Sequence, residues 1–310
     1  MTRPPFPAVI DSSMLAAFKS CPRKAFLGYF EHWKPAAESI HLVAGKAFAA
    51  GLETSRRAFY IEGKPPEEAI ALGMGTLLQE YGTFQPNEYE IKTAIRMAGA
   101  LEFYFQSYPL GADGAKPHIF PGTAHGIEFS FCNPFPVLHP TTGDPLLFSG
   151  RADMAADAFG GVFLYDEKTA SQLGASWIKQ WEHRSQFTAY CWGFREHGYK
   201  PTGLVVRGVS ILKHDYGTEQ VITYRAGWEV DRWLESTTHL VKRMIRCWEE
   251  GYWDYNLDDA CNAYGGCSFN RVCKSPEPEK WLSLYYHKRK WDPVARTETV
   301  MIQQPDGSWA

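Results

Sequence analysis

Two aspartates and a lysine stand close together near the middle of the chain. Asp153 ends the stretch Gly150-Arg151-Ala152-Asp153, and Asp166 and Lys168 follow within Tyr165-Asp166-Glu167-Lys168-Thr169. Carboxylates are the hard oxygen ligands that Mg²⁺ and Mn²⁺ prefer in proteins. A cation held there would polarise a phosphate and lower the pKa of an attacking water, and a lysine would stabilise the developing charge. The pattern therefore predicts metal-assisted hydrolysis of a phosphodiester.

These side chains converge if the segments that carry them are β-strands. The segments 125–132, 146–156 and 161–168 contain β-formers separated by turn residues, and Gly160-Gly161 predicts a hairpin between the last two. Alternate side chains of a strand share a face, so Asp166 and Lys168 lie together and the hairpin brings Asp153 to them. Glu128, on the preceding strand, is a candidate third carboxylate.

Four cysteines at the two ends of the chain form a second candidate metal site. Cys21 stands near the start, and the others read Cys261-x5-Cys267-x5-Cys273. Soft thiolates select iron–sulphur clusters or zinc, and zinc sites usually contain paired Cys-x-x-Cys knuckles, which are missing here. The spacing favours an iron–sulphur cluster, with structural zinc as the alternative. Three further cysteines are in apolar or amphipathic contexts and are interpreted as core thiols: Cys132, Cys191 and Cys247.

The composition excludes some classes of protein. The fractions of hydrophobic residues (45%) and charged residues (22%) are ordinary for a globular protein, and the formal charge of −3 argues against a sequence-reading DNA-binding protein. Any contact with nucleic acid must come from a local patch, such as Lys242-Arg243 or His287-Lys288-Arg289-Lys290. With no long apolar run and no secretory signal, we expect no membrane span and a cytoplasmic protein of a bacterial or phage-infected cell.

The remaining patterns predict the elements that position these residues. Helices are expected at 14–30, 44–60, 67–81, 89–107, 175–197 and 229–250, and further strands at 203–213 and 218–225. The sequence thus predicts one compact α/β domain. Its parts are a helical N-terminal region with Cys21 (1–115), a central core (116–226), and a C-terminal helix with the cysteine cluster and tail (227–310).

The central motifs resemble the PD-(D/E)xK nuclease superfamily in its RecB-like branch. The similarity rests on Gly150-x-x-Asp153, on Asp166-x-Lys168-Thr169, and on Gln186-Phe187-Thr188-Ala189-Tyr190 in the following helix. It implies a restriction-endonuclease-like core, a central mixed sheet flanked by helices. It also implies that Asp153, Asp166 and the main-chain carbonyl of Glu167 bind Mg²⁺ or Mn²⁺. Lys168 would assist the attacking water, and Gln186 and Tyr190 would position substrate and active site.

One departure from this family concerns a metal-binding histidine on an N-terminal helix, in a Gly-x-x-x-His pattern. The matching stretch here is Gly45-Lys46-Ala47-Phe48-Ala49, with alanine at the histidine position. Glu53, one helical turn further on, is a candidate to point the same way. The loss of the histidine should weaken or reshape one metal position.

The cysteine layout is similar to that of the AddAB-type helicase–nuclease and of CRISPR-associated RecB-like nucleases. The segment Phe18-x-x-Cys21-Pro22-Arg23-Lys24 is similar to their N-terminal cysteine motif, although the C-terminal spacing is longer than theirs. The resemblance implies a structural [4Fe–4S] cluster bound by Cys21, Cys261, Cys267 and Cys273 in a C-terminal iron–sulphur segment.

These patterns predict a metal-dependent nuclease, and the resemblance to the RecB-like branch implies an exonuclease on single-stranded DNA or DNA ends in recombination or repair. It would work alone or beside a helicase or an annealing protein, as in a phage or bacterial recombination system. Because Ala49 replaces the histidine, the alternative is a catalytically weak or inactive iron–sulphur subunit that binds DNA ends. A zinc-stapled RNA-processing nuclease is a third possibility.

Overall fold

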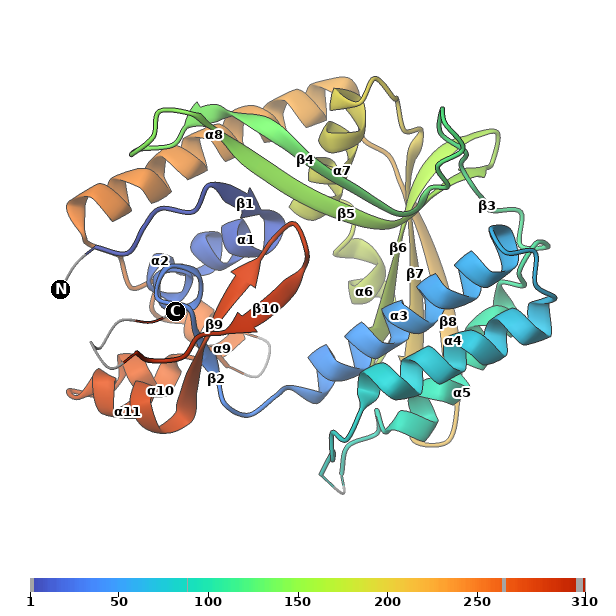
Figure 1. Ribbon diagram of the computed structural model, residues 1–310, viewed down its shortest axis with the longest axis horizontal. Coiled ribbons are helices and arrows are strands. Elements are labelled where there is room, and N and C mark those ends of the chain that lie inside the picture. Colours follow the sequence, from blue (N-terminus) through green and yellow to red (C-terminus); the bar gives the residue numbers. More distant parts are fainter. Residues whose placement is uncertain (1–2, 88, 264–265, 305–308, 310) are drawn as a thin grey trace. The chain divides into compact units, whose positions relative to one another are not determined.

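The computed structural model describes residues 3–87, 89–263, 266–304 and 309, and its chain forms two compact units. The first unit takes its described residues from 1–37, 131–150 and 231–310, and the second takes them from 38–130 and 151–230. Three elements contribute residues to both units: β4 (Ile127–Leu138), β5 (Pro145–Ala158) and α8 (Gly227–Glu250) (Figure 1).

The second unit is built on a mixed β-sheet. Met154–Ala158 of β5 pair antiparallel with β6 (Gly161–Ala170), β6 runs parallel to β7 (Gly203–Ile211), and β7 pairs antiparallel with β8 (Tyr216–Thr223). A parallel pair needs a long crossover, and the chain makes it through two helices. The crossover helices are α6 (Ala175–Lys179) and α7 (Ser185–Glu196), and a short strand, β3 (Lys116–Pro117), pairs with the end of β5.

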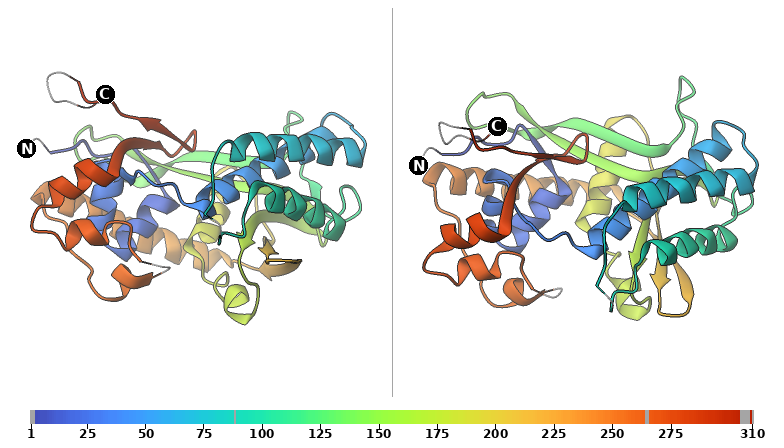
Figure 2. Two further views of the ribbon diagram at one scale, coloured as in Figure 1. Left: turned by 90° about the horizontal axis from the view of Figure 1, so that it is seen from below. Right: turned by 60° about the horizontal axis from the view of Figure 1, so that its bottom comes forward.

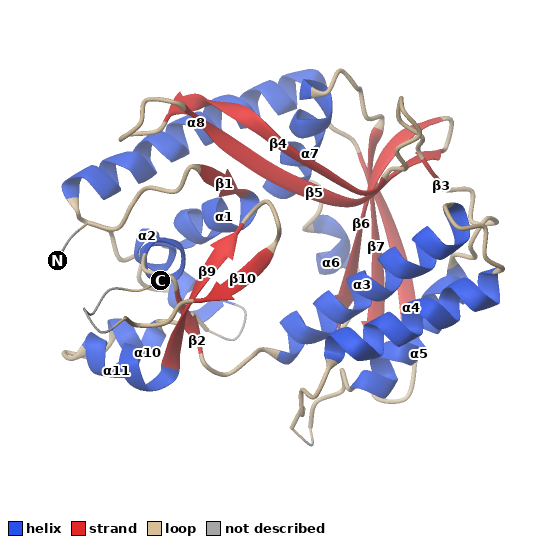
Figure 3. Ribbon diagram, in the orientation of Figure 1, coloured by secondary structure: helices blue, strands red, loops and turns tan. Residues whose placement is uncertain are grey.

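Helices α3 (Ile40–Tyr60) and α5 (Ala94–Ser107) contact one face of this sheet, and α4 (Pro66–Tyr81) packs against both of them. Their apolar side chains, including Phe48 and Leu101, form one core cluster with Val209 and Ile211 of β7. Gly208, which alternates with Val209, faces the other way, because a Cβ there would lie 2.5 Å from the Trp177 ring of α6. The predicted α/β architecture, a central mixed sheet flanked by helices, is thus confirmed (Figure 3).

Close approach of α3 and α4 depends on glycine. A Cβ on Gly73 would lie 1.9 Å from Ser55 Oγ and 2.5 Å from the carbonyl oxygen of Gly51, whereas a Cβ on Gly75 would meet nothing within 4 Å. Gly73 therefore sets the distance between two helices, and Gly75 does not.

The first unit contains short elements from the two ends of the chain. β1 (Val9–Asp11) pairs parallel with Leu147–Ser149 of β5, and a separate antiparallel sheet has the order β10 (Thr297–Val300), β9 (Tyr286–Asp292), β2 (Trp33–Pro35). Figure 2 shows the two C-terminal strands, in red, from two further directions. The helices are α1 (Ser12–Ser20), α2 (Pro22–Ala25), a π-helix (Phe26–Phe30), α9 (Asp259–Asn262), α10 (Asn270–Cys273) and α11 (Pro278–Tyr285). Among the described residues no helix combines the length and apolarity that crossing a membrane requires.

Several predicted boundaries were wrong for identifiable reasons. The helix expected at 14–30 breaks at Cys21, which is extended (φ −162°) because Pro22 follows and disfavours helical backbone before it. The helix expected from 89 begins at Ala94, where the Thr93 side chain accepts the Arg96 N–H at 3.3 Å. The helix expected at 175–197 is divided into α6 and α7, and the strand expected at 125–132 continues to Leu138.

The hairpin between β5 and β6 is confirmed, one residue earlier than expected. Its central residues are Phe159 and Gly160, both with positive φ (51° and 78°), as in the two-residue turns whose twist matches a β-hairpin. The short strands β1, β2, β9 and β10 were not predicted.

Candidate active site

The β5–β6 hairpin brings the two predicted aspartates to the same place. The pairing runs from Ala158↔Gly161 to Met154↔Tyr165, so the next residues along the two strands are Asp153 and Asp166. Residues opposite each other in an antiparallel pair project to the same face. Asp153 Oδ2 also accepts the Glu167 N–H at 2.7 Å, so this carboxylate is fixed to the backbone of β6.

Lys168 lies beside Asp166 on β6 and forms an ion pair with its Oδ2 atom. The Asp166 side chain is only 2% exposed, whereas that of Lys168 is 35% exposed, so the amine links a buried carboxylate to the solvent. Burial lowers the pKa of Lys168, but the Asp166 and Asp153 carboxylates outweigh this effect and raise the pKa above its usual value. The lysine is therefore a cation at neutral pH.

Burial and mutual repulsion disfavour the simultaneous ionisation of the neighbouring acidic side chains. Burial, followed by the charges of Asp166 and Glu167, raises the pKa of Asp153 well above its usual range. Asp166 Oδ2 is buried, and its partner is the Lys168 amine. Two buried carboxylates close together are a donor set that suits a hard divalent cation. In the described part of the chain, however, no group of three or more His, Cys, Asp or Glu side chains is arranged to hold a metal ion.

Glu128 differs from the two aspartates because its ion-pair partner is an arginine. Its carboxylate forms an ion pair with Arg151 Nε at 2.8 Å, and its backbone has a positive φ of 58°, a strained conformation for a residue with a side chain. Burial raises its pKa to about 7, against the opposing effect of Arg151, and the charge of Glu53 adds to the increase. Glu53 itself pairs with Arg57 at 2.8 Å.

Gln186 and Tyr190 of α7 form a short relay to Asp166. Gln186 Nε2 donates to the Tyr190 hydroxyl at 2.6 Å, and this hydroxyl donates to Asp166 Oδ1 at 3.5 Å. Tyr190 is buried and the helix is packed along its length, so the relay is held in place. Ala49, at the position of the expected histidine, lies on α3 and supplies no ligand atom.

The four predicted cysteines line one cavity of the first unit, together with Lys24, Tyr255, Leu257 and Phe269 among others. Burial raises the pKa of Cys273, and the nearby Cys267, Cys21 and Cys261 raise it further. The Asn256 N–H lies 3.4 Å from Cys21 Sγ and donates to it. Thiols are the ligand type that an iron–sulphur cluster or zinc prefers, but the described residues do not bring three of them into a metal-binding arrangement.

A family model decides the relationship of the chain. The model of the PD-(D/E)XK nuclease superfamily matches residues 12–274. This chain belongs to the PD-(D/E)XK nuclease superfamily. Membership implies an enzyme that hydrolyses phosphodiester bonds, with DNA as its expected substrate and Mg²⁺ or Mn²⁺ as the usual cofactor of such nucleases.

A solved structure is similar to this PD-(D/E)XK protein in fold. A "Putative exonuclease" from Eubacterium rectale is similar with a TM-score of 0.51 and 12% identity, over 83% of this chain and 88% of that one. The protein SSO0001 has a TM-score of 0.30 and 15% identity, over 64% of this chain and 74% of its own, and supports no inference. No curated protein sequence matches this chain.

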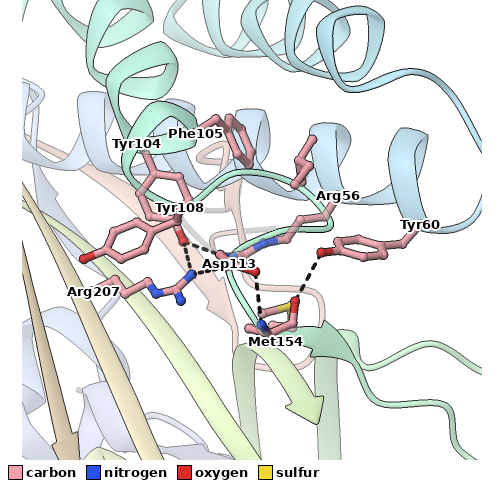
Figure 4. A pocket seen from close by; sticks show the side chains of 10 residues that line it. Arg56, Tyr60, Tyr104, Phe105, Tyr108, Asp113, Met154 and Arg207 are labelled. Carbon is pink, nitrogen blue, oxygen red and sulfur yellow. Dashed lines mark hydrogen bonds and ion pairs between the residues drawn. The ribbon is translucent and has the colours of Figure 1, made fainter. Parts of the chain in front are cut away.

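The candidate site also has a buried layer that the sequence did not predict. Glu167, between the two motif residues of β6, is 9% exposed and binds Arg56 of α3 and Tyr104 of α5. Figure 4 shows Arg56, Tyr104 and Arg207 around a small pocket. One signal was available, because Arg56 follows Phe48 and Leu52 at four-residue spacing and so falls on the apolar face of its helix.

Proposed function

We propose that this chain is a metal-dependent DNA exonuclease of the RecB-like branch that acts on single-stranded DNA or DNA ends. The observation that carries the proposal is the convergence of Asp153, Asp166 and Lys168 at the open end of the β5–β6 hairpin. Two carboxylates and a solvent-accessible amine are the parts that metal-assisted phosphodiester hydrolysis requires.

Each residue has a role that follows from its surroundings. Asp153, Asp166, Glu128 and the main-chain carbonyl of Glu167 would hold Mg²⁺ or Mn²⁺. The bound cation supplies a polarised phosphate and a more acidic water. Lys168 orients that water and stabilises charge growing on the phosphate oxygens, and its pKa keeps it protonated for the second task. Gln186 and Tyr190 keep the Asp166 carboxylate in one orientation.

The cysteines have a structural role in this proposal. Cys21, Cys261, Cys267 and Cys273 would bind a [4Fe–4S] cluster in the C-terminal iron–sulphur segment, and the cavity that all four line supports this assignment. We propose that the whole chain is one RecB-like nuclease domain, with the parts 1–115, 116–226 and 227–310. It would act alone or beside a helicase or annealing protein in recombination or repair.

The test compares three proteins on end-labelled single-stranded DNA with Mn²⁺: wild type, Lys168→Ala and Lys213→Ala. We expect the wild type and the exposed Lys213 variant to degrade the strand equally. The Lys168 variant should be about 10²- to 10³-fold slower, the usual cost of removing one group that stabilises transition-state charge. Equal rates for all three proteins would contradict the assigned site.

A second candidate is an inactive iron–sulphur subunit that binds DNA ends. Ala49 in place of a ligating histidine favours it. Binding of single-stranded DNA without degradation, in both the wild type and the Lys168 variant, would support this function.

A further inference from the structure

The main chain and the side chain of Glu167 make contacts in different directions from β6. Its N–H donates to Asp153 Oδ2 at 2.7 Å. Because strand side chains alternate, the Glu167 side chain projects away from those of Asp166 and Lys168, toward α3 and α5. A contact that restrains the Glu167 side chain therefore also restrains the Glu167 N–H, which donates to Asp153.

Arg56 of α3 grips the Glu167 carboxylate with two nitrogens. Its Nη1 donates to Oε2 at 3.2 Å, and its Nη2 forms an ion pair with Oε1. The Tyr104 hydroxyl of α5 donates to Oε1 at 3.0 Å and accepts from Arg56 Nη2 at 3.0 Å. A bidentate guanidinium contact restricts both the position and the rotation of the carboxylate. A lysine ammonium on its flexible side chain does not restrict both.

The network continues to a second buried arginine. Arg207 of β7, paired with Glu167 in the parallel ladder, donates to the Tyr104 hydroxyl at 3.3 Å and to Asp113 Oδ2 at 2.7 Å. Arg56 and Arg207 are only 4% and 3% exposed. Figure 4 shows both guanidinium groups directed toward the Tyr104 hydroxyl.

Stability alone is a poor explanation for burying these charges. Removing an arginine and a carboxylate from water costs several kcal/mol per ion, and apolar residues of similar volume are often as stable or more stable. The network instead resembles the outer shell of a metal site, whose members orient the ligands without touching the metal.

We propose that Arg56 is a positioning residue for the catalytic cation, acting through Glu167. By fixing the Glu167 side chain on the helical face, it fixes the residue whose N–H binds Asp153 and whose own main-chain carbonyl would face the metal. This inference rests on the proposed function, and it adds a residue that contacts neither substrate nor metal.

The test measures Mn²⁺ binding by calorimetry, together with thermal unfolding and the Mn²⁺ dependence of DNA degradation. The main variant is Arg56→Met/Glu167→Met, which removes both charges and so avoids an unpaired buried ion. Arg56→Lys keeps the charge but loses the two-pronged contact. Gly73→Ala is the control, because it disturbs the packing of α3 on α4 without touching Glu167.

We expect the double variant to unfold cooperatively near the wild-type temperature and to bind Mn²⁺ about 10- to 100-fold more weakly. Arg56→Lys should fall between it and the wild type, and Gly73→Ala should lose stability while keeping its Mn²⁺ affinity. Unchanged Mn²⁺ affinity in the double variant, or an equal loss in Gly73→Ala, would overturn the inference and leave the proposed function standing. A wild-type protein that binds no Mn²⁺ would overturn both.

Discussion

At the scale of single residues, the site brings acidic side chains close together, and without a bound metal their negative charges repel one another. Burial raises the pKa of Asp153, and the negative charges of Asp166, Glu167 and Glu128 raise it further. Ionisation of this carboxylate therefore costs stability in the fold, and the cost grows as pH rises above the pKa of about 3.9 that an unfolded Asp has. A divalent cation would turn the same arrangement from a cost into a binding site.

Asp153→Asn should consequently shift stability and activity in opposite directions. The amide oxygen can still accept the Glu167 N–H, so we expect the metal-free variant to be more stable than the wild type at pH 7. Its stability should also decline less as pH rises above about 4, while nuclease activity is lost. Denaturant unfolding across this pH range measures the effect.

Added Mn²⁺ provides the control for that experiment. Saturating Mn²⁺ should stabilise the wild type, by about 2.7 kcal/mol at a hundred times the dissociation constant, and stabilise Asp153→Asn much less. A variant that is less stable than the wild type without metal, yet gains equally from Mn²⁺, would show that Asp153 is not a ligand.

At the scale of elements, the site depends on how β6 is held between two helical layers. Asp166 meets Tyr190 of α7 on one face, and Glu167 meets Arg56 of α3 on the other. The alternation of a strand makes this division possible, since neighbouring residues serve different layers. The Arg56 contact from α3 therefore bears on the strand that carries the candidate catalytic residues.

Two glycines of α4 test how closely α3 is packed. Gly75→Ala should raise the free energy of unfolding by about 0.5–1 kcal/mol, because alanine is the better helix former and the site is open. Gly73→Ala should lower it by about 1–3 kcal/mol, because its methyl group would collide with Ser55 and Gly51. Thermal unfolding of both variants gives the comparison, and the same sign for both would mean that α4 does not pack on α3 as described.

At the scale of the whole molecule, each predicted site lies within one compact unit although its residues are scattered along the chain. All four cysteines belong to the first unit, and Glu128, Asp153, Asp166, Lys168, Gln186 and Tyr190 belong to the second. A cluster that joins Cys21 to the C-terminal cysteines would close a very long loop and so limit the entropy of the unfolded chain.

Cys273→Ser should therefore remove the cluster and destabilise the protein. Loop-closure arguments put the loss at up to about 5 kcal/mol. Iron content and visible absorption after anaerobic purification, with denaturant unfolding, measure both effects. Cys132→Ser, a half-buried thiol outside the four, is the control and should retain iron. If the wild type contains zinc instead of iron, the four cysteines bind structural zinc and not an iron–sulphur cluster.

The sequence alone predicted that the candidate catalytic residues of the core lie together, because strand alternation and a two-residue hairpin translate spacing directly into proximity. Asp153, Asp166 and Lys168 meet for that local reason. The strand–hairpin–strand–helix order likewise indicated an α/β fold. These are short-range properties that a single chain segment can specify.

Only the tertiary structure decided what surrounds them. The partnership of Arg56 with Glu167 joins residues far apart in the sequence, and neither side chain reveals its partner until α3 packs on the sheet. The pairing of Glu128 with Arg151 and the short strands at the chain ends were hidden for the same reason. Such contacts depend on long-range packing, where burial and charge pairing override local propensity.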